Sequence, residues 1–231
     1  MRYDVFENHV AVRNTFREMK GMKIMNEALV KVRKRLKWDT LAVLVVIILL
    51  VALAGGSIAQ AIIQGTKERS SFEVRLEYDS IMDSSFYMLY IDGEPHSVVD
   101  YNEYVRSDSM ANSANPKVAL VIEYTVRAFQ CLLGAAVFFM MYLVFAQVQK
   151  EHTPFTRKNV RYLRIAAVLT MLLGLLPGAI KLFMSIVVYN TAYAPFTVGA
   201  ILTVSIGIVL GMISEIFVYG CAVQEDLDQI A

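Results

Sequence analysis

Residues 41–63 read LAVLVVIILLVALAGGSIAQAII, and this stretch contains no charged side chain. A helix over these residues would be roughly 35 Å long at 1.5 Å per residue, enough to cross the ~30 Å hydrocarbon core of a bilayer. Three more apolar runs follow, at about 120–148, 163–189 and 196–222. The whole chain is 56% hydrophobic and only 19% charged, a composition typical of integral membrane proteins. Because lipid-exposed backbone must satisfy its own hydrogen bonds, the sequence predicts an all-α transmembrane four-helix bundle.

Charge is distributed unequally along the chain, and this predicts an orientation. Residues 1–39 contain ten Lys or Arg and five acidic residues, and the loop 149–164 contains five basic residues and one acidic residue. Residues 63–117 contain five basic and ten acidic residues, a net charge of −5. By the positive-inside rule, both termini lie in the cytoplasm and 64–117 forms an extracytoplasmic insert between the first two spans. The chain therefore divides into a basic N-terminal region, 1–39, and a four-span membrane domain, 40–231.

The insert has the pattern of a small β-rich unit. Residues 72–78 alternate apolar and charged side chains, which is typical of a half-buried strand. Residues 85–91 are rich in aromatic side chains, and Asp92-Gly93 followed by residues 98–104 predicts a hairpin. Two roles stay open for the aromatic and acidic residues here. Either they pack the insert onto the helix ends and form its solvated face, or they bind a cationic ligand.

The N-terminal region carries a helical pattern. Apolar side chains recur every three or four residues and basic side chains fill many of the other positions; the apolar stripe consists of Met22, Met25, Leu29, Val32 and Leu36. A cytoplasmic amphipathic N-terminal helix of this kind lies on an anionic lipid surface, where each basic residue contributes roughly 1 kcal/mol. The alternative is a docking surface for a cytoplasmic partner, with the helix bound in a groove.

Ionisable residues inside the spans are candidate functional residues, because charge in the hydrocarbon core is costly. Glu123 and Arg127 are one helical turn apart, and Lys181 reaches the same outer level on the third span. We expect these three side chains to form a polar cluster at the outer mouth of the bundle.

A second candidate group is expected at the cytoplasmic face. Glu215 lies near the end of the fourth span, and Arg161 and Arg164 lead into the third span. Either arginine is therefore an expected partner for Glu215. The alternative for both candidate groups is purely structural: the charged side chains extend to the interface, pair there and fix the register of the bundle.

Small residues predict close packing between the third and fourth spans. Gly174 with Gly178 and Gly207 with Gly211 form two small-xxx-small pairs at nearly equal distances from the expected turn. Folding the hairpin would bring the two pairs to the same depth, where missing side chains let the backbones approach. A homodimer face is the alternative use of these glycines. Pro177, inside the first pair, is expected to kink its helix.

Two stretches resemble a known family. Residues 152–164, HTPFTRKNVRYLR, predict a proline turn followed by Thr156 as the N-cap of a helix. Residues 214–228 contain a Glu-x-Phe-x-x-Gly motif, from Glu215 to Gly220, and an acidic tail. Together with the order and spacing of the spans, these motifs resemble the bacterial membrane family catalogued as domain of unknown function 2975. In that family, Pro-Phe, Asn-Val and Leu-Arg lead into the third of four spans.

The resemblance implies a multi-pass protein of the bacterial cytoplasmic membrane with no established chemistry. Members of the family are often found beside small helix-turn-helix regulators. The resemblance therefore implies a cytoplasmic partner of that type, in addition to the lipid bilayer, and a regulatory role held at the membrane.

The sequence offers little support for catalysis. The three histidines lie in separate segments, and neither zinc-ligand spacing nor a glycine-rich phosphate loop occurs. Cys131 and Cys221 both lie in apolar stretches, which excludes a disulfide framework. We expect no enzyme activity, no cofactor or metal and no direct nucleic-acid binding.

Two functions therefore stay open. The first is a regulatory or sensory membrane protein that couples to a cytoplasmic partner. The second is a small transporter or the accessory subunit of an export system, which Pro177 and the glycine pairs would suit.

Overall fold

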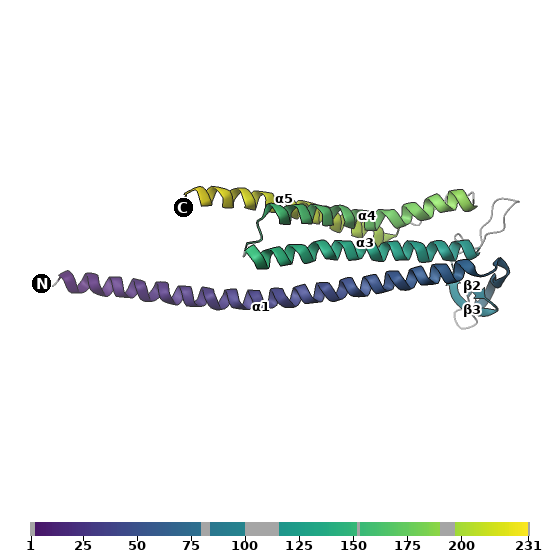
Figure 1. Cartoon of the computed structure of the whole chain (residues 1–231), viewed down its shortest axis with the longest axis horizontal. Coiled ribbons are helices and arrows are strands. Elements are labelled where there is room, and N and C mark those ends of the chain that lie inside the picture. The colour runs from purple at the N-terminus through teal and green to yellow at the C-terminus, as the bar shows by residue number, and fades with distance from the viewer. Residues whose placement is uncertain (1–2, 80–83, 100–115, 152, 190–196, 231) are drawn as a thin grey trace.

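Four long helices dominate the computed structural model, which describes residues 3–79, 84–99, 116–151, 153–189 and 197–230. Each helix contains a segment long and apolar enough to cross a membrane (Figure 1). The helices are α1 (Tyr3–Thr66), α3 (Pro116–Glu151), α4 (Arg157–Tyr189) and α5 (Val198–Ile230). The prediction of four apolar spans in a mostly helical chain is confirmed. The expected turn at 190–195, and the start of the fourth span at 196, lie outside the described residues.

α1 runs unbroken from the N-terminal region into the first apolar segment, so the boundary expected at residues 39 and 40 is not a break in the helix. No proline or glycine stands there, and the Thr40 hydroxyl donates to the Leu36 carbonyl oxygen at 2.7 Å instead of capping a new helix. With 64 residues, α1 is roughly 96 Å long. Its N-terminal half extends past the ends of the other helices (Figure 1). The side chains of residues 3–34, with most of the predicted stripe, lie outside the described residues.

A three-stranded antiparallel sheet follows α1 after one 3₁₀ turn, η1 (Arg69–Ser71). Its strands are β1 (Phe72–Asp79), β2 (Ser84–Ile91) and β3 (Glu94–Val99), in that spatial order. Asp92 and Gly93 connect β2 to β3 with φ values of 55° and 84°. Positive φ at both central residues is the geometry of the tight hairpin turn that an Asp-Gly pair predicts. Residues 100–104 of the predicted hairpin lie outside the described residues.

The sheet packs against the first turns of α3. One face of the sheet and α3 share an apolar cluster, which consists of Phe72, Leu89, Ile91, Ala119 and Leu120. The Lys67 ammonium at the end of α1 pairs with the Asp92 carboxylate at 2.6 Å, and Lys117 Nζ donates to the Lys67 carbonyl oxygen at 2.5 Å. These contacts tie the sheet to the end of α1 and the beginning of α3. We call this the sheet end of the helices, and the end where residues 153–156 lie the opposite end.

Polar residues on β1 and β2 pair with one another. Arg75 pairs with Glu73 at 2.6 Å and lies 4.6 Å from the centre of the Tyr90 ring, whose hydroxyl donates to Glu77. The hydrogen bond from Arg75 lowers the pKa of Glu73, and the hydrogen bond to Glu77 raises the pKa of Tyr90. Glu73, Glu77 and Tyr90 therefore have partners within the sheet.

In the described chain, extensive packing joins consecutive helices: α1 with α3, α3 with α4, and α4 with α5. Among the described residues α1 does not pack extensively on α4 or α5. The four helices therefore form an open row (Figure 1), and the four-helix bundle expected from the sequence stays a prediction.

Glycine allows the backbones of α4 and α5 to approach at two levels. A Cβ atom on Gly174 would lie 2.8 Å from the Ala200 carbonyl oxygen, and one on Gly207 would lie 3.0 Å from the Ala167 carbonyl oxygen. Both distances are shorter than a Cβ atom normally makes with a carbonyl oxygen, so a side chain at either position would force its neighbours to shift. Each of these glycines packs against the partner helix, as expected for a small-xxx-small interface.

The two glycine pairs do not lie at the same depth, and that prediction is wrong. Gly174 is opposite residues 200–204, whereas Gly207 is opposite residues 167–171. The reason is steric: each glycine receives a larger side chain of the other helix, Val204 or Met171, so the glycines alternate along the interface. Within the pairs, a Cβ on Gly211 would make only an ordinary contact, 3.9 Å from Ala167 Cβ, and Gly178 lines a pocket described below.

Gly174→Ala should lower the melting temperature of the protein in detergent. The added methyl group would press on the Ala200 carbonyl oxygen and force α5 away from α4, and overpacking of this kind costs roughly 1–3 kcal/mol. The matched control is Gly55→Ala in α1, where a Cβ meets nothing within 4 Å and alanine is the better helix former. Equal melting temperatures for the two variants would contradict the close packing.

Asp92→Asn should loosen the sheet at neutral pH but not at low pH. The hydrogen bond from Lys67, and then that from Ser71, hold the pKa of Asp92 below its ordinary value of 3.8. A lowered pKa means that the carboxylate stabilises the fold above pH 3.8, and that this contribution is lost as the pH falls through the lower value. Asparagine tolerates the positive φ of this position, so the turn itself is kept.

Hydrogen exchange of the amides of residues 84–99 measures this effect. At pH 7, exchange should be several-fold faster in Asp92→Asn than in the wild type, and the difference should vanish near pH 2. The control is Glu94→Gln, which removes an exposed carboxylate beside the turn. If the control loosens the sheet as much as Asp92→Asn does, the Lys67 pair is not the anchor.

Candidate functional site

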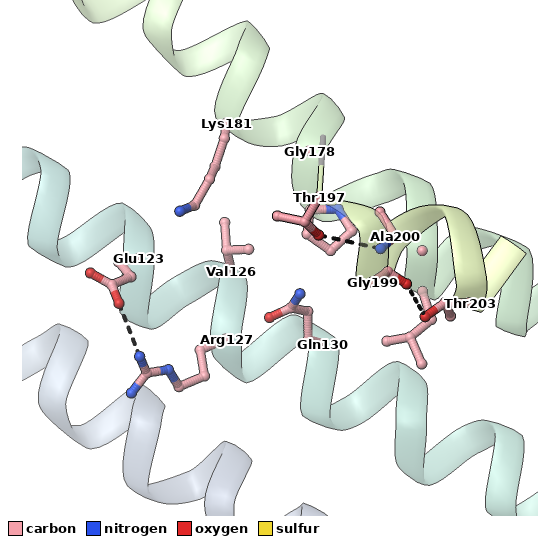
Figure 2. A pocket seen from close by; sticks show the side chains of 13 residues that line it. Glu123, Val126, Arg127, Gln130, Gly178, Lys181, Thr197, Gly199, Ala200 and Thr203 are labelled. Atoms are coloured by element: carbon pink, nitrogen blue, oxygen red, sulfur yellow. Dashed lines mark hydrogen bonds and ion pairs between the residues drawn. The ribbon is translucent and has the colours of Figure 1, made fainter. Parts of the chain in front are cut away.

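A pocket of about 420 Å³ lies among α3, α4 and α5 towards their sheet ends (Figure 2). Its walls combine charged and polar side chains with very small residues. The charged and polar residues that line it are Glu123, Arg127, Gln130, Lys181, Thr197 and Thr203. All three members of the first group predicted from the sequence line this one pocket.

Glu123 and Arg127 occupy successive turns of α3, and the guanidinium pairs with the carboxylate at 2.9 Å. Lys181 extends from α4 towards α3, with its ammonium on the side of Glu123 (Figure 2). The pocket thus brings together one carboxylate and two basic groups from two helices. Gln130, which the sequence analysis did not single out, adds an amide on the same face of α3.

Small residues and one proline form the rest of the wall. Pro177 has no N–H group, so the Leu173 carbonyl does not receive the hydrogen bond that residue 177 would donate in a regular helix. Leu173 and Pro177 line the pocket, together with Gly178 and Gly199. α4 is continuous through Pro177. Glycine has only a hydrogen atom in place of a side chain. The two glycines, one on α4 and one on α5, therefore leave the pocket space that the basic groups border.

The lining offers charged and polar groups to a solute. Among its described residues it has no histidine, cysteine or serine. The described part of the chain holds no group of three His, Cys, Asp or Glu side chains arranged for a metal ion. Two basic groups beside one carboxylate favour a small molecule that carries an anionic group.

The second predicted group lies at the opposite end of the helices. Arg164 Nη2 and Glu215 Oε1 are 2.8 Å apart, so Arg164, and not Arg161, is the partner of Glu215. Two turns away along α4, Arg157 makes hydrogen bonds of 3.0–3.2 Å to both carboxylate oxygens of Glu225. Two ion pairs therefore join the beginning of α4 to the end of α5.

Contacts of the 153–156 loop complete this junction. The ring of Phe155 lies 5.4 Å from that of Phe217, and a Cβ on Gly220 would overlap the Phe155 ring. Thr156 Oγ1 accepts a hydrogen bond from the Asn159 amide at 3.2 Å, which confirms the predicted N-cap. Asn159 itself is fully buried and donates its side-chain amide to the Pro154 carbonyl oxygen at 2.9 Å.

The two stretches that carry the family resemblance are therefore in direct contact, although they are far apart in sequence. Gly220 and Asn159 belong to the two motifs, but the motifs alone did not predict the packing roles of these residues. A glycine and a nearby aromatic residue on the fourth span were visible signals. These signals did not identify Phe155 as the residue that covers Gly220, because that identification requires the register between α4 and α5.

The Arg164–Glu215 pair should couple energetically across the helices. We expect Glu215→Gln to lower the melting temperature by roughly 2–4 °C, the shift that about 1 kcal/mol causes in a protein of this size. The same substitution in an Arg164→Gln background should have little further effect. A double-mutant cycle in detergent measures the coupling, with Arg161→Gln in place of Arg164→Gln as the matched control. Equal coupling to both arginines would contradict the assigned pair.

Comparisons of this chain with protein-family models, with curated proteins and with solved structures find no match. The fold and the two polar groups are therefore described from this chain alone, and the family resemblance stays a prediction.

Proposed function

We propose that the chain is a multi-pass protein of the bacterial inner membrane that couples its sheet to a cytoplasmic partner, and so acts as a regulatory or sensory protein. The observation that carries this proposal is the continuity of α1. One helix joins the sheet, the first apolar segment and an N-terminal half that extends past the other helices (Figure 1).

The proposed orientation places both termini and the 153–156 loop in the cytoplasm. Both termini lie towards the end of the molecule away from the sheet (Figure 1). The described residues of the basic regions 1–39 and 149–164 lie on that side, whereas the described acidic residues of 63–117 lie at the sheet end (Figure 1). This distribution supports the orientation, since loops rich in Lys and Arg are retained in the cytoplasm. The sheet then lies outside the cell membrane.

The length of α1 supports the coupling role. Crossing the hydrocarbon core uses about 30 Å, and α1 is roughly three times as long, at 1.5 Å for each of its 64 residues. The sheet is attached directly to the end of this helix through the Lys67–Asp92 pair. Because α1 also packs along α3, a ligand at the sheet would shift α1 and α3 together, and α1 would carry this shift to its N-terminal half.

The proposed partner binds the N-terminal half of α1. Its basic residues and its predicted apolar stripe fit an acidic groove with an apolar floor on a cytoplasmic protein. The family resemblance adds that such a partner is a helix-turn-helix regulator. The contact between the two motif stretches, through Phe155, Phe217 and Gly220, supports the resemblance. Under this proposal the chain is not an enzyme and does not itself bind nucleic acid.

A second candidate function is that of a small transporter or an accessory subunit of an export system. One observation favours it: the pocket that Lys181 and Glu123 line contains a proline inside α4 and opens a polar space between three apolar helices. Ionisable groups between membrane helices often mark solute paths. The regulatory proposal is preferred because it also accounts for the length of α1.

A photo-crosslinking residue at position 29, on the predicted stripe, should capture one cytoplasmic protein in native membranes. The matched control is the same residue at position 27, on the opposite side of the predicted helix, which should capture little. If the sheet is coupled to this site, Asp92→Asn should change the crosslinking yield at position 29, whereas Glu94→Gln should not. Mass spectrometry of the crosslinked product identifies the partner.

Two other results would contradict the regulatory proposal. Crosslinks from position 29 to lipid alone would mean that the stripe lies on the inner leaflet. Capture of an ATPase or of a second multi-pass subunit would instead favour the export function.

A further inference from the structure

A second pocket, of about 450 Å³, lies beside the first turns of α4 at the opposite end. Three arginines line it, Arg157, Arg161 and Arg164, and their spacing of four and three residues places them on one face of the helix. Ile165 from α4 and Val218 from α5 contribute an apolar part of the wall. We propose that this pocket binds the phosphate group of an anionic phospholipid of the surrounding membrane.

Two of the three arginines are paired with carboxylates, so the third can bind a ligand. Arg157 pairs with Glu225 at 3.0 Å and Arg164 pairs with Glu215 at 2.8 Å, which hold these two guanidinium groups in place. Arg161 makes neither an ion pair nor a hydrogen bond within the described residues. A guanidinium presents two parallel N–H donors to two phosphate oxygens. Arg161 is therefore the principal phosphate ligand, with the fixed arginines on either side.

The depth of the pocket in the membrane points to a lipid. The uncharged run of α4 begins at Ile165, directly after Arg164. Arginines at that boundary lie at the level of the lipid headgroups, where basic pockets between membrane helices bind anionic lipids. Ile165 is partly exposed, so an apolar surface continues from the arginines towards the hydrocarbon.

The apolar wall distinguishes a phospholipid from free phosphate. The headgroup phosphate lies on Arg161, while the glycerol and the first acyl carbons contact Ile165 and Val218. A free phosphate ion would gain nothing from those two side chains and would leave them in water. The inference uses only the membrane location of the chain and needs no cytoplasmic partner, so it can fail or succeed independently of the function proposed above.

Thermal unfolding of the purified protein in neutral detergent tests the site. Added phosphatidylglycerol should raise the melting temperature of the wild type by several degrees, whereas phosphatidylcholine should not, because a ligand that binds only the folded state stabilises it. Arg161→Gln should abolish most of the shift. The matched control is Lys158→Gln, which removes one positive charge from the same turn at a residue that does not line the pocket, and it should keep the shift.

Three results would overturn the proposal. Equal shifts in Arg161→Gln and Lys158→Gln would mean that general surface charge, and not the pocket, attracts the lipid. An equal shift with phosphatidylcholine would remove the role of the anionic headgroup. A shift of the same size with inorganic phosphate, lost in Arg161→Gln, would assign the pocket to a free ion. If a variant is too unstable for thermal unfolding, native mass spectrometry of bound lipid compares its lipid binding with that of the wild type. Arg161→Lys is expected to retain part of the binding.

Discussion

The close approach of the α4 and α5 backbones determines where most of the polar residues meet. Gly174 and Gly207 lack the side chains that would separate the helices, and each accepts a larger neighbour from the other helix. This packing sets one antiparallel register along the whole pair. The same register aligns Arg164 with Glu215 and lays Phe155 over Gly220 at the opposite end. At the sheet end it places Thr197 and the first turns of α5 along the wall of the pocket that Lys181 lines.

Local signals in the sequence predicted the elements well, because such signals depend only on neighbouring residues. Uninterrupted apolar runs predicted the four spans, Asp92-Gly93 predicted the hairpin turn, and Thr156 predicted a helix cap. The change from charged to apolar sequence near residue 40 does not coincide with a helix end, since a change in polarity alone does not break a helix where neither proline nor glycine stands. The sites depended on distances between helices. Charge alone could not choose between Arg161 and Arg164 as the partner of Glu215, because both lie within a turn of the correct depth.

The open row consists of two tightly packed pairs. α1, α3 and the sheet form one unit, held by the apolar cluster around Leu89 and by the Lys67–Asp92 pair. α4 and α5 form the other unit, held by glycine packing and by ion pairs from Arg157 and Arg164. The two units meet where α3 packs on α4. The polar pocket lies at this junction, because Glu123 and Arg127 belong to the first unit and Lys181 belongs to the second.

This division connects the pocket to the proposed coupling. Within each unit the close packing resists internal rearrangement, so a change in shape is concentrated at the α3–α4 contact. A solute that touches Glu123 on one side and Lys181 on the other would favour one relative position of the two units. The size of the shift would be set by the difference between the affinities of the solute for the two positions. Any such shift also moves α1, since α1 and the sheet are fixed to α3. Under the proposed coupling, the pocket would act on the extended N-terminal half of α1 through the packed pair of α1 and α3.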